Sequence, residues 1–372
     1  MRTGRRAVLH IGTEKTGTTA LQEALAASAP LLAEHGWRYP DLGPDPSHAA
    51  LACYAADRDE DVEDIAAMAG VRPAEDRAAF SERLERRLTA EVAAHPEARF
   101  LFSTEHGHSR LVTPTAVERL RALLSRYFDE VDVLVYLRRW DRLDHSMYST
   151  LLRDGETRRF AFGVLLRPEY FDYVGMLERW AAVFGAKRLS VAIHDRGSMM
   201  NGSILDDVSA CLGLPSLPPR GRTNEALGGR GRWLLREVNL RLGDVDPARA
   251  ATVRWQVIEA LEGTEPGPSA RPARADAVAF VRGFDGQAAW IRDRYFPGRE
   301  RLFDDGFDEY PEQEEVAGPD AREIVDVMTT ALLNLALTEP VARDADQGGP
   351  RGSGRLDRPH DQGRRPCPSA CS

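Results

Sequence analysis

Short apolar stretches alternate along the chain with longer segments in which apolar residues recur at helical intervals. Four of these stretches are short, apolar and free of helical spacing, which predicts buried strands at residues 7–11, 99–103, 131–137 and 188–194. A helical segment follows each strand, so we expect an α/β fold with a central parallel sheet flanked by helices on both faces. Functional side chains should then collect beyond the carboxyl ends of the strands.

Helical pattern also dominates outside the strand-bearing region. Residues 28–95 read as mainly helical, with a proline-containing loop near residues 40–46, and residues 229–338 are predominantly helical as well. From residue 342 to residue 372 the chain contains mostly Gly, Arg, Asp, Pro and Ser, with almost no large apolar side chain. The pattern predicts one α/β domain over residues 1–341, with additional helices at its C-terminal end, and a disordered tail over residues 342–372.

Composition narrows the class of protein. The chain has 372 residues, of which 42% are hydrophobic and 29% charged, as expected for a globular protein with a sizeable core. Its net charge of −9 argues against a general nucleic-acid binder, which normally carries a basic face. No apolar run approaches the ~18 residues of a membrane span. No export signal is visible, and the four cysteines (Cys53, Cys211, Cys367 and Cys371) do not suggest a disulfide framework, so we expect a cytoplasmic protein.

The segment between the first strand and the following helix contains the most specific pattern in the chain. It reads Gly12-Thr13-Glu14-Lys15-Thr16-Gly17-Thr18-Thr19, and we expect the two threonines at its end to cap the helix. A glycine-bearing loop between a strand and a helix directs backbone N–H groups to one point, where an anion fits. A simple strand-turn-helix corner is the alternative reading.

This loop differs from the nucleotide triphosphate loop in one respect. In the pattern G-x-x-x-x-G-K-[ST], the lysine follows the second glycine, but here Thr18 occupies that position and the lysine is Lys15. The glycines that shape the anion-binding loop are retained, but the positively charged residue lies inside the loop instead of after the second glycine. The Lys15 ammonium is therefore expected to lie beside the bridging oxygen of a 5′ anion that is shorter than a triphosphate.

The motif K-T-G-T-T after a strand resembles the 5′-phosphosulfate loop of the sulfotransferases that use 3′-phosphoadenosine 5′-phosphosulfate (PAPS). The resemblance extends over roughly residues 7–242 and includes the helical segment at residues 173–185 and the segment at residues 222–227. It implies a P-loop-like fold, no metal requirement, and a 5′-phosphate site formed by Lys15, Thr16, Gly17, Thr18 and Thr19. Two family features are missing: Ala20 stands at the position of a tryptophan, and no R-K-G segment is evident.

The end of the third strand resembles the family's site for the 3′-phosphate of the nucleotide. Arg138 closes the strand and Ser146 follows eight residues later in the next helix. A guanidinium group presents a planar, permanently charged fork to a phosphate, and a hydroxyl group adds a compact donor. The resemblance assigns Arg138 and Ser146 to this site, although Arg139 is adjacent and could serve instead.

The end of the second strand offers candidates for a catalytic base. Glu105, His106 and His108 follow the strand closely. A glutamate at this position removes the acceptor's proton in the glycan sulfotransferases that the chain resembles, and a histidine does so in the cytosolic small-molecule branch. Glu105 is the preferred base and His106 the alternative. In an extended backbone, His106 and His108 would point the same way and could hold a metal with Glu105, although this spacing is a weak metal signal.

Together these features predict a bacterial-type sulfotransferase that transfers the sulfuryl group of PAPS to a hydroxyl or amine of a glycan or metabolite, leaving the product nucleotide PAP. The helical insertion at about residues 28–95 and the loop at residues 157–171 would form the acceptor pocket. Two alternatives remain: a P-loop kinase or NTPase, and a catalytically inactive nucleotide-binding protein.

Overall fold

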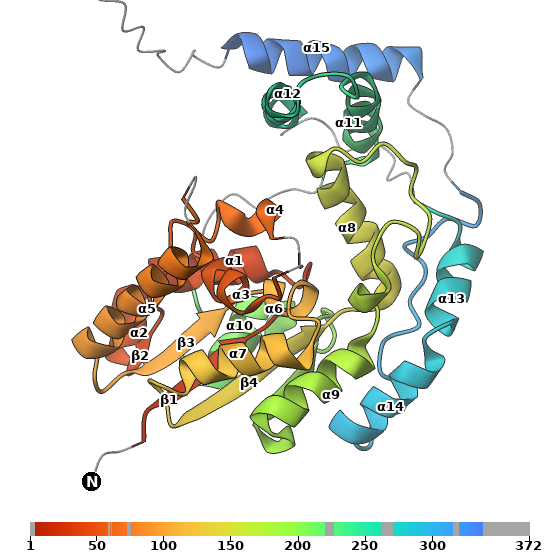
Figure 1. Ribbon diagram of the computed structural model, residues 1–372. Helices are drawn as coiled ribbons and strands as arrows, with labels where there is room; N and C mark the ends of the chain where they lie inside the picture. Colours follow the sequence, from red (N-terminus) through yellow and green to blue (C-terminus); the bar gives the residue numbers. More distant parts are fainter. Residues whose placement is uncertain are drawn as a thin grey trace, which may run out of the picture.

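A five-stranded parallel sheet forms the centre of the protein (Figure 1). The computed structural model describes residues 4–58, 60, 62–72, 76–219, 227–261, 271–314 and 320–337. The strands lie in the order β2 (Trp37–Arg38), β3 (Arg99–Ser103), β1 (Arg6–His10), β4 (Glu130–Leu137) and β5 (Leu189–Ile193). In the register of the central strands, His10 lies opposite both Ser103 and Leu134. The segments that follow β1, β3 and β4 therefore leave the same edge of the sheet.

Helices cover both faces of this sheet, because alternate strand residues point to opposite sides. On one face, Leu9, Phe102 and Val133 share a buried cluster with residues of α3 (Ala49–Ala55), α5 (Arg77–Ala94), α7 (Pro114–Leu124) and α9 (Tyr173–Phe184). On the other face, Leu101 and Leu134 pack with residues of α1 (Thr18–Ala27), α2 (Ala29–Glu34) and α10 (Ile204–Leu212). The predicted α/β fold, with a parallel sheet between helices, is confirmed.

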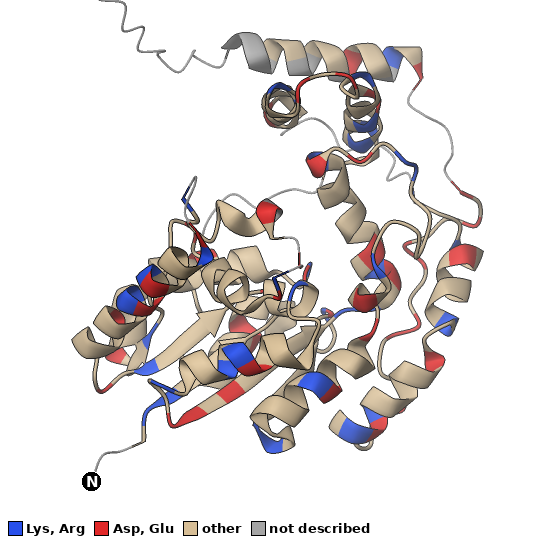
Figure 2. Ribbon diagram, in the orientation of Figure 1, with Lys and Arg blue, Asp and Glu red and all other residues tan. Residues whose placement is uncertain are grey.

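A second group of helices lies beyond the carboxyl edge of the sheet. Helix α8 (Trp140–Asp154) leads from the end of β4 toward α11 (Gly229–Arg241), α12 (Pro247–Leu261) and α15 (Ala321–Leu337) (Figure 1). Helix α13 (Arg274–Arg282) lies beside α8, and α14 (Asp285–Tyr295) lies beside α9. Leu152 of α8 and Leu235 of α11 are buried in one cluster with Ile258 of α12. Figure 2 shows arginines along α11 and acidic residues where α8 begins. Within the described residues, no helix combines the length and apolar character that crossing a membrane requires.

The predicted elements match the structure closely near the sheet. All four predicted strands are present with bounds within one residue of those expected. Strand β2 was not predicted, because it has only two residues. Helices α13 and α14 lie within residues 229–338, which were predicted to be predominantly helical, although weak apolar periodicity did not mark their individual bounds. The predictions for residues 222–226 and 342–372 lie outside the described residues.

Candidate functional site

The loop between β1 and α1 forms a tight turn with three residues in the left-handed region. Gly12 and Gly17 each have φ of 76°, and Lys15 has φ of 62°. Gly17 is the N-cap of α1, and no side-chain hydrogen bond caps this helix. The prediction that the threonines cap it is therefore wrong: Thr18 is the first helical residue and is buried, whereas Thr19 is exposed. The N–H groups of the first turn thus remain available to an anion.

Hydrogen bonds to the neighbouring strand hold this loop in place beyond the end of β1. The N–H of Ile11 donates to the carbonyl of Leu134 (3.0 Å), and the N–H of Thr13 donates to that of Tyr136 (2.9 Å). The Thr13 hydroxyl donates to the same Tyr136 carbonyl (3.1 Å), and the Thr16 hydroxyl donates to the Thr13 carbonyl (2.5 Å). The loop is therefore fixed by the sheet before any ligand binds.

Lys15 is partly buried within the loop. A non-glycine residue in the left-handed region costs about 1–2 kcal/mol, which the surrounding hydrogen bonds must offset. Burial is the main reason that the pKa of the Lys15 ammonium is lowered from its ordinary value. Glu14 opposes this effect, Arg138 and Arg153 add to it, and Glu105 opposes it weakly. An anion bound in the loop would favour the charged form of Lys15 and so oppose this lowering of its pKa.

Arg138 and Arg139 follow β4 but have different environments. The Arg138 guanidinium donates to the carbonyl oxygen of Lys15, so it lies against the loop. The Arg139 side chain is 1% exposed, pairs with Asp141 through Nε and Oδ1 (2.7 Å), and also pairs with Asp304 (2.9 Å). Arg139 is thus already neutralised by carboxylates, whereas Arg138 forms no ion pair with a carboxylate in the described part of the chain.

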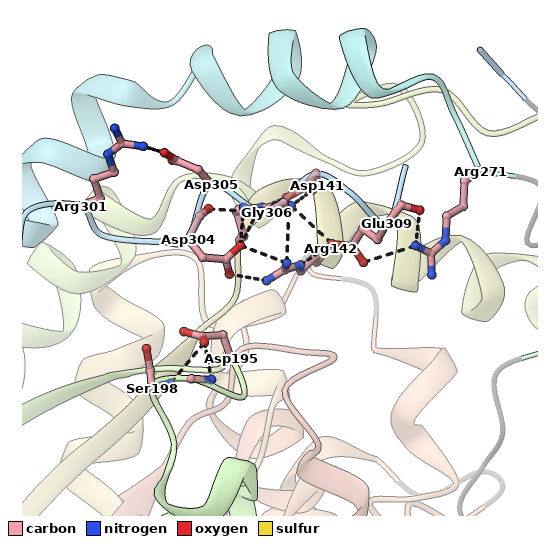
Figure 3. Close-up of polar contacts among 12 residues, drawn as sticks. Asp141, Arg142, Asp195, Ser198, Arg271, Arg301, Asp304, Asp305, Gly306 and Glu309 are labelled. Carbon is pink, nitrogen blue, oxygen red and sulfur yellow. Dashed lines mark hydrogen bonds and ion pairs between the residues drawn. The ribbon is translucent and has the colours of Figure 1, made fainter. Parts of the chain in front are cut away.

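A network of charged residues surrounds Arg139 and anchors the segment after α14. Figure 3 shows Arg142 between Asp304 and Glu309, with Asp141 close by. Arg142 pairs with each of these two acids at 2.7 Å. The Arg139 guanidinium also stacks over the ring of Phe307, 4.1 Å from its centroid. These contacts indicate a structural role for Arg139.

Ser146 lies in α8 and is partly buried. Its neighbour His145 has its pKa lowered to about 3, mainly by burial and then by the charges of Arg232, Arg271 and Arg138. Arg232 of α11 also lies within hydrogen-bond distance of His145 Nε2 (3.1 Å). Ser146 and Arg153 are seven residues apart, so they lie on one face of α8. The charge of Arg153, like that of Arg138, also acts on Lys15, so this face of α8 is directed to the loop.

Glu105 is the second residue after β3 and lies beside the loop, next to Gly12. Its Oε2 accepts a hydrogen bond from the Nε2 of Gln22 in α1 (2.7 Å). The same Gln22 amide lies 3.3 Å from the Ser103 hydroxyl, which is itself bonded to Nδ1 of His10 (2.9 Å). Burial lowers the pKa of His10 to about 4, although the charge of Glu105 acts in the opposite direction. The Glu105 carboxylate is therefore hydrogen-bonded by a neutral amide, with the neutral His10 ring nearby.

His106 and His108 do not share one direction, contrary to the expectation from an extended backbone. Both lie in the short helix α6 (His106–Ser109), where two positions correspond to a rotation of about 200°. Nδ1 of His106 is 3.9 Å from Oε1 of Glu14, whereas the His108 ring packs edge-on against Tyr170 (centroids 5.4 Å apart). Among the described residues, no group of three or more His, Cys, Asp or Glu is arranged to hold a metal ion.

Three residues of this region were not identified from the sequence. His194 follows β5 and its Nε2 lies 3.6 Å from the position of a Cβ on Gly17, so the rule that functional groups follow parallel strands could have found it. Arg153 could have been found from its spacing to Ser146. Gln22 gave no signal, because a polar residue in an amphipathic helix normally faces solvent.

The likeness of this chain to known proteins is weak. No protein-family model matches the chain, and no curated protein matches it. A solved structure of a sulfotransferase from Alicyclobacillus acidocaldarius is similar over 68% of this chain and 97% of that one, with 15% identity and a TM-score of 0.38. A likeness of this size carries no information about activity.

Proposed function

We propose that this protein is a sulfotransferase that uses PAPS. The observation that supports this most strongly is the contact between the Arg138 guanidinium and the Lys15 carbonyl, because it joins two cations of the predicted nucleotide site. Neither side chain forms an ion pair with a carboxylate within the described ranges. Two partly buried cations at a helix N-terminus favour a ligand with more than one anionic group.

The described residues fit such a nucleotide. The loop amides and the hydroxyl groups of Thr18 and Thr19 would hold the 5′-phosphate at the positive end of α1. Arg138 and Ser146 would hold the 3′-phosphate, with Arg153 adding positive charge on the same face of α8. A nucleotide without the 3′-phosphate would leave the Arg138 charge without an anionic partner.

The chemistry requires a base and a cation on opposite sides of the reacting group. Bound PAPS supplies a sulfuryl group attached to a phosphate leaving group. Glu105 would accept the proton of the acceptor hydroxyl or amine, and the Lys15 ammonium would stabilise the negative charge that develops on the bridging oxygen. His106, close to Glu14, is the alternative base. The acceptor proposed here is a glycan or metabolite.

A kinase or NTPase reading has less support. A triphosphate site normally uses a lysine after the second glycine and an acidic residue near the end of a strand to hold magnesium. Here the residue after Gly17 is Thr18, and β4 is followed by Arg138 and Arg139. The positive charge at the end of β4 suits a second phosphate better than a divalent cation.

Transfer of labelled sulfate tests the proposal. Purified protein would be incubated with ³⁵S-labelled PAPS and a panel of glycans and metabolites, and label in the acceptor would be measured. Lys15→Ala should lower the transfer rate at least about 100-fold, the magnitude typical of a lost transition-state contact. Lys187→Ala is the matched control, because Lys187 is the other lysine of the chain and is exposed in η2 (Ala186–Arg188). Full transfer by Lys15→Ala would contradict the proposal.

A further inference from the structure

Gln22 is a buried amide in the second turn of α1 that contacts Glu105. Its side chain belongs to a residue only 2% exposed, and its Nε2 lies 2.7 Å from Oε2 of Glu105. Two longer contacts join the same Nε2 to the Ser103 hydroxyl (3.3 Å) and carbonyl (3.5 Å). Gln22 therefore uses its amide nitrogen to link the carboxylate to the end of β3.

The orientation of this amide follows from its partners. A carboxylate oxygen and a backbone carbonyl are acceptors only, so both must face the NH₂ group of Gln22. Rotating the amide by 180° would place its oxygen against Oε2 of Glu105 and leave two buried acceptors opposed. The donor role of Gln22 is thus fixed by the chemistry of its surroundings.

The groups that face Glu105 leave its charge without a cationic partner of its own. Glu105 forms no ion pair with the residues that the structure describes. His10 of β1 is kept neutral near pH 7, since burial lowers its pKa to about 4, and burial raises the pKa of Tyr39, next to β2, well above its ordinary value. Lys15 of the loop, on whose pKa the charge of Glu105 has a small raising effect, and the adjacent His106 of α6 are further titratable neighbours. A neutral amide is the direct partner of the carboxylate.

We propose that Gln22 is a positioning residue that fixes the carboxylate of Glu105 for proton acceptance without neutralising it; this inference rests on the proposed function. A cation bonded to Oε2 would hold the group as firmly but would make it a weaker base. The hydrogen bond from the Gln22 amide fixes Oε2 of Glu105, so that Oε1 can receive the proton of the acceptor. Because Gln22 and the anion loop belong to the same helix, α1 sets the base and the nucleotide relative to each other.

Three variants separate positioning from general loss of packing. Gln22→Met keeps the length of the side chain and removes the donor. Gln22→Glu keeps the shape of the side chain and replaces the donor with a second carboxyl group, which repels the carboxylate of Glu105. Gln287→Met is the matched control: Gln287 of α14 donates to the Phe171 carbonyl (3.1 Å) and accepts from the N–H of Val174 (3.2 Å), away from the loop.

The ¹³C signal of the Glu105 carboxyl carbon, assigned with Glu105→Gln, would be recorded at pH 7 by NMR, and PAP binding would be measured by calorimetry. We expect the Glu105 carboxyl signal to move in Gln22→Met and in Gln22→Glu, because both variants lose the donor at Oε2, but to keep its position in Gln287→Met. PAP affinity should change less than about threefold in Gln22→Met.

Each failure has its own signature. An unchanged carboxyl signal in Gln22→Met, or an equal displacement of that signal in Gln287→Met, would overturn the positioning role even if PAP binds normally. Absence of PAP binding by the unaltered protein would instead overturn the proposed function, and with it the role of Glu105 as a base.

Discussion

The backbone of Gly12 lies against the backbone of Glu105: a Cβ atom added to Gly12 would stand 2.8 Å from the Cα atom of Glu105. Gly12 also has φ of 76°, which side chains with a Cβ rarely adopt. The predicted anion loop and the predicted base are therefore in direct contact through their main chains. A side chain at residue 12 must displace one of them.

Gly12→Ala should accordingly impair both stability and transfer. We expect the free energy of unfolding to fall by about 2–3 kcal/mol, from backbone strain plus steric displacement, with a loss of sulfuryl transfer. Gly36→Ala is the control, because Gly36 has a similar φ of 72° but no atom within 4 Å of an added Cβ. It should lose only about 1 kcal/mol, measured by urea unfolding. Equal losses in the two variants would contradict the steric argument.

Arg138→Ala and Arg139→Ala should change the free energy of unfolding by very different amounts, although the residues are adjacent. Removing Arg139 leaves Asp141, which is fully buried, without its cation, so we expect the free energy of unfolding to fall by about 3–5 kcal/mol. Arg138→Ala removes a cation that has no carboxylate partner among the described residues, and should change stability by less than about 1 kcal/mol. Chemical unfolding of both variants would check this, and an inverted order of stabilities would refute the assignment.

The affinity for PAP should fall at alkaline pH because of Lys15. Burial lowers the pKa of this ammonium from its ordinary value, and a bound anion favours the charged form. Affinity is therefore highest below the Lys15 pKa and declines as pH rises through it. In Lys15→Arg the side chain stays charged, so calorimetry between pH 7 and pH 10 should show no such decline. The same pH dependence in both proteins would exclude Lys15 as its source.

Stability should decrease as pH falls from about 6.5 toward 4, because buried histidines resist protonation. The pKa of His48 is lowered from 6.5 to about 4, chiefly by burial, so the unfolded chain binds a proton that the folded chain does not. One such group contributes about 3 kcal/mol that is fully present above pH 6.5 and is lost in this window. Urea unfolding of His48→Gln between pH 7 and pH 4.5 should show a shallower decline than the unaltered protein; parallel curves would contradict this.

The sheet and the loop could be predicted from the sequence because their signals are local. A buried parallel strand is a short apolar run, and Gly12, Lys15 and Gly17 occupy fixed positions after the first such run. The placement of Arg138 beside the loop follows from the parallel order of β1 and β4. These inferences need only neighbouring residues and one topological rule.

The remainder of the site depends on contacts between distant segments. Arg139 is occupied by Asp304, which is 165 residues away, so no local pattern distinguishes it from Arg138. Gln22 and Glu105 are 83 residues apart in the sequence, so no local pattern indicates their contact either. The directions of His106 and His108 were predicted incorrectly because a four-residue helix after a strand has too few positions to show helical spacing.

The affinity of the protein for PAP compared with that for 5′-AMP tests the central claim most directly. The two nucleotides differ by the 3′-phosphate, which Arg138 is proposed to bind. Calorimetry at pH 7 should show PAP binding at least about 30-fold more tightly than 5′-AMP, corresponding to about 2 kcal/mol for a charge-assisted contact. In Arg138→Ala this preference should disappear while the affinity for 5′-AMP is retained. Equal affinities for PAP and 5′-AMP in the unaltered protein would contradict the account.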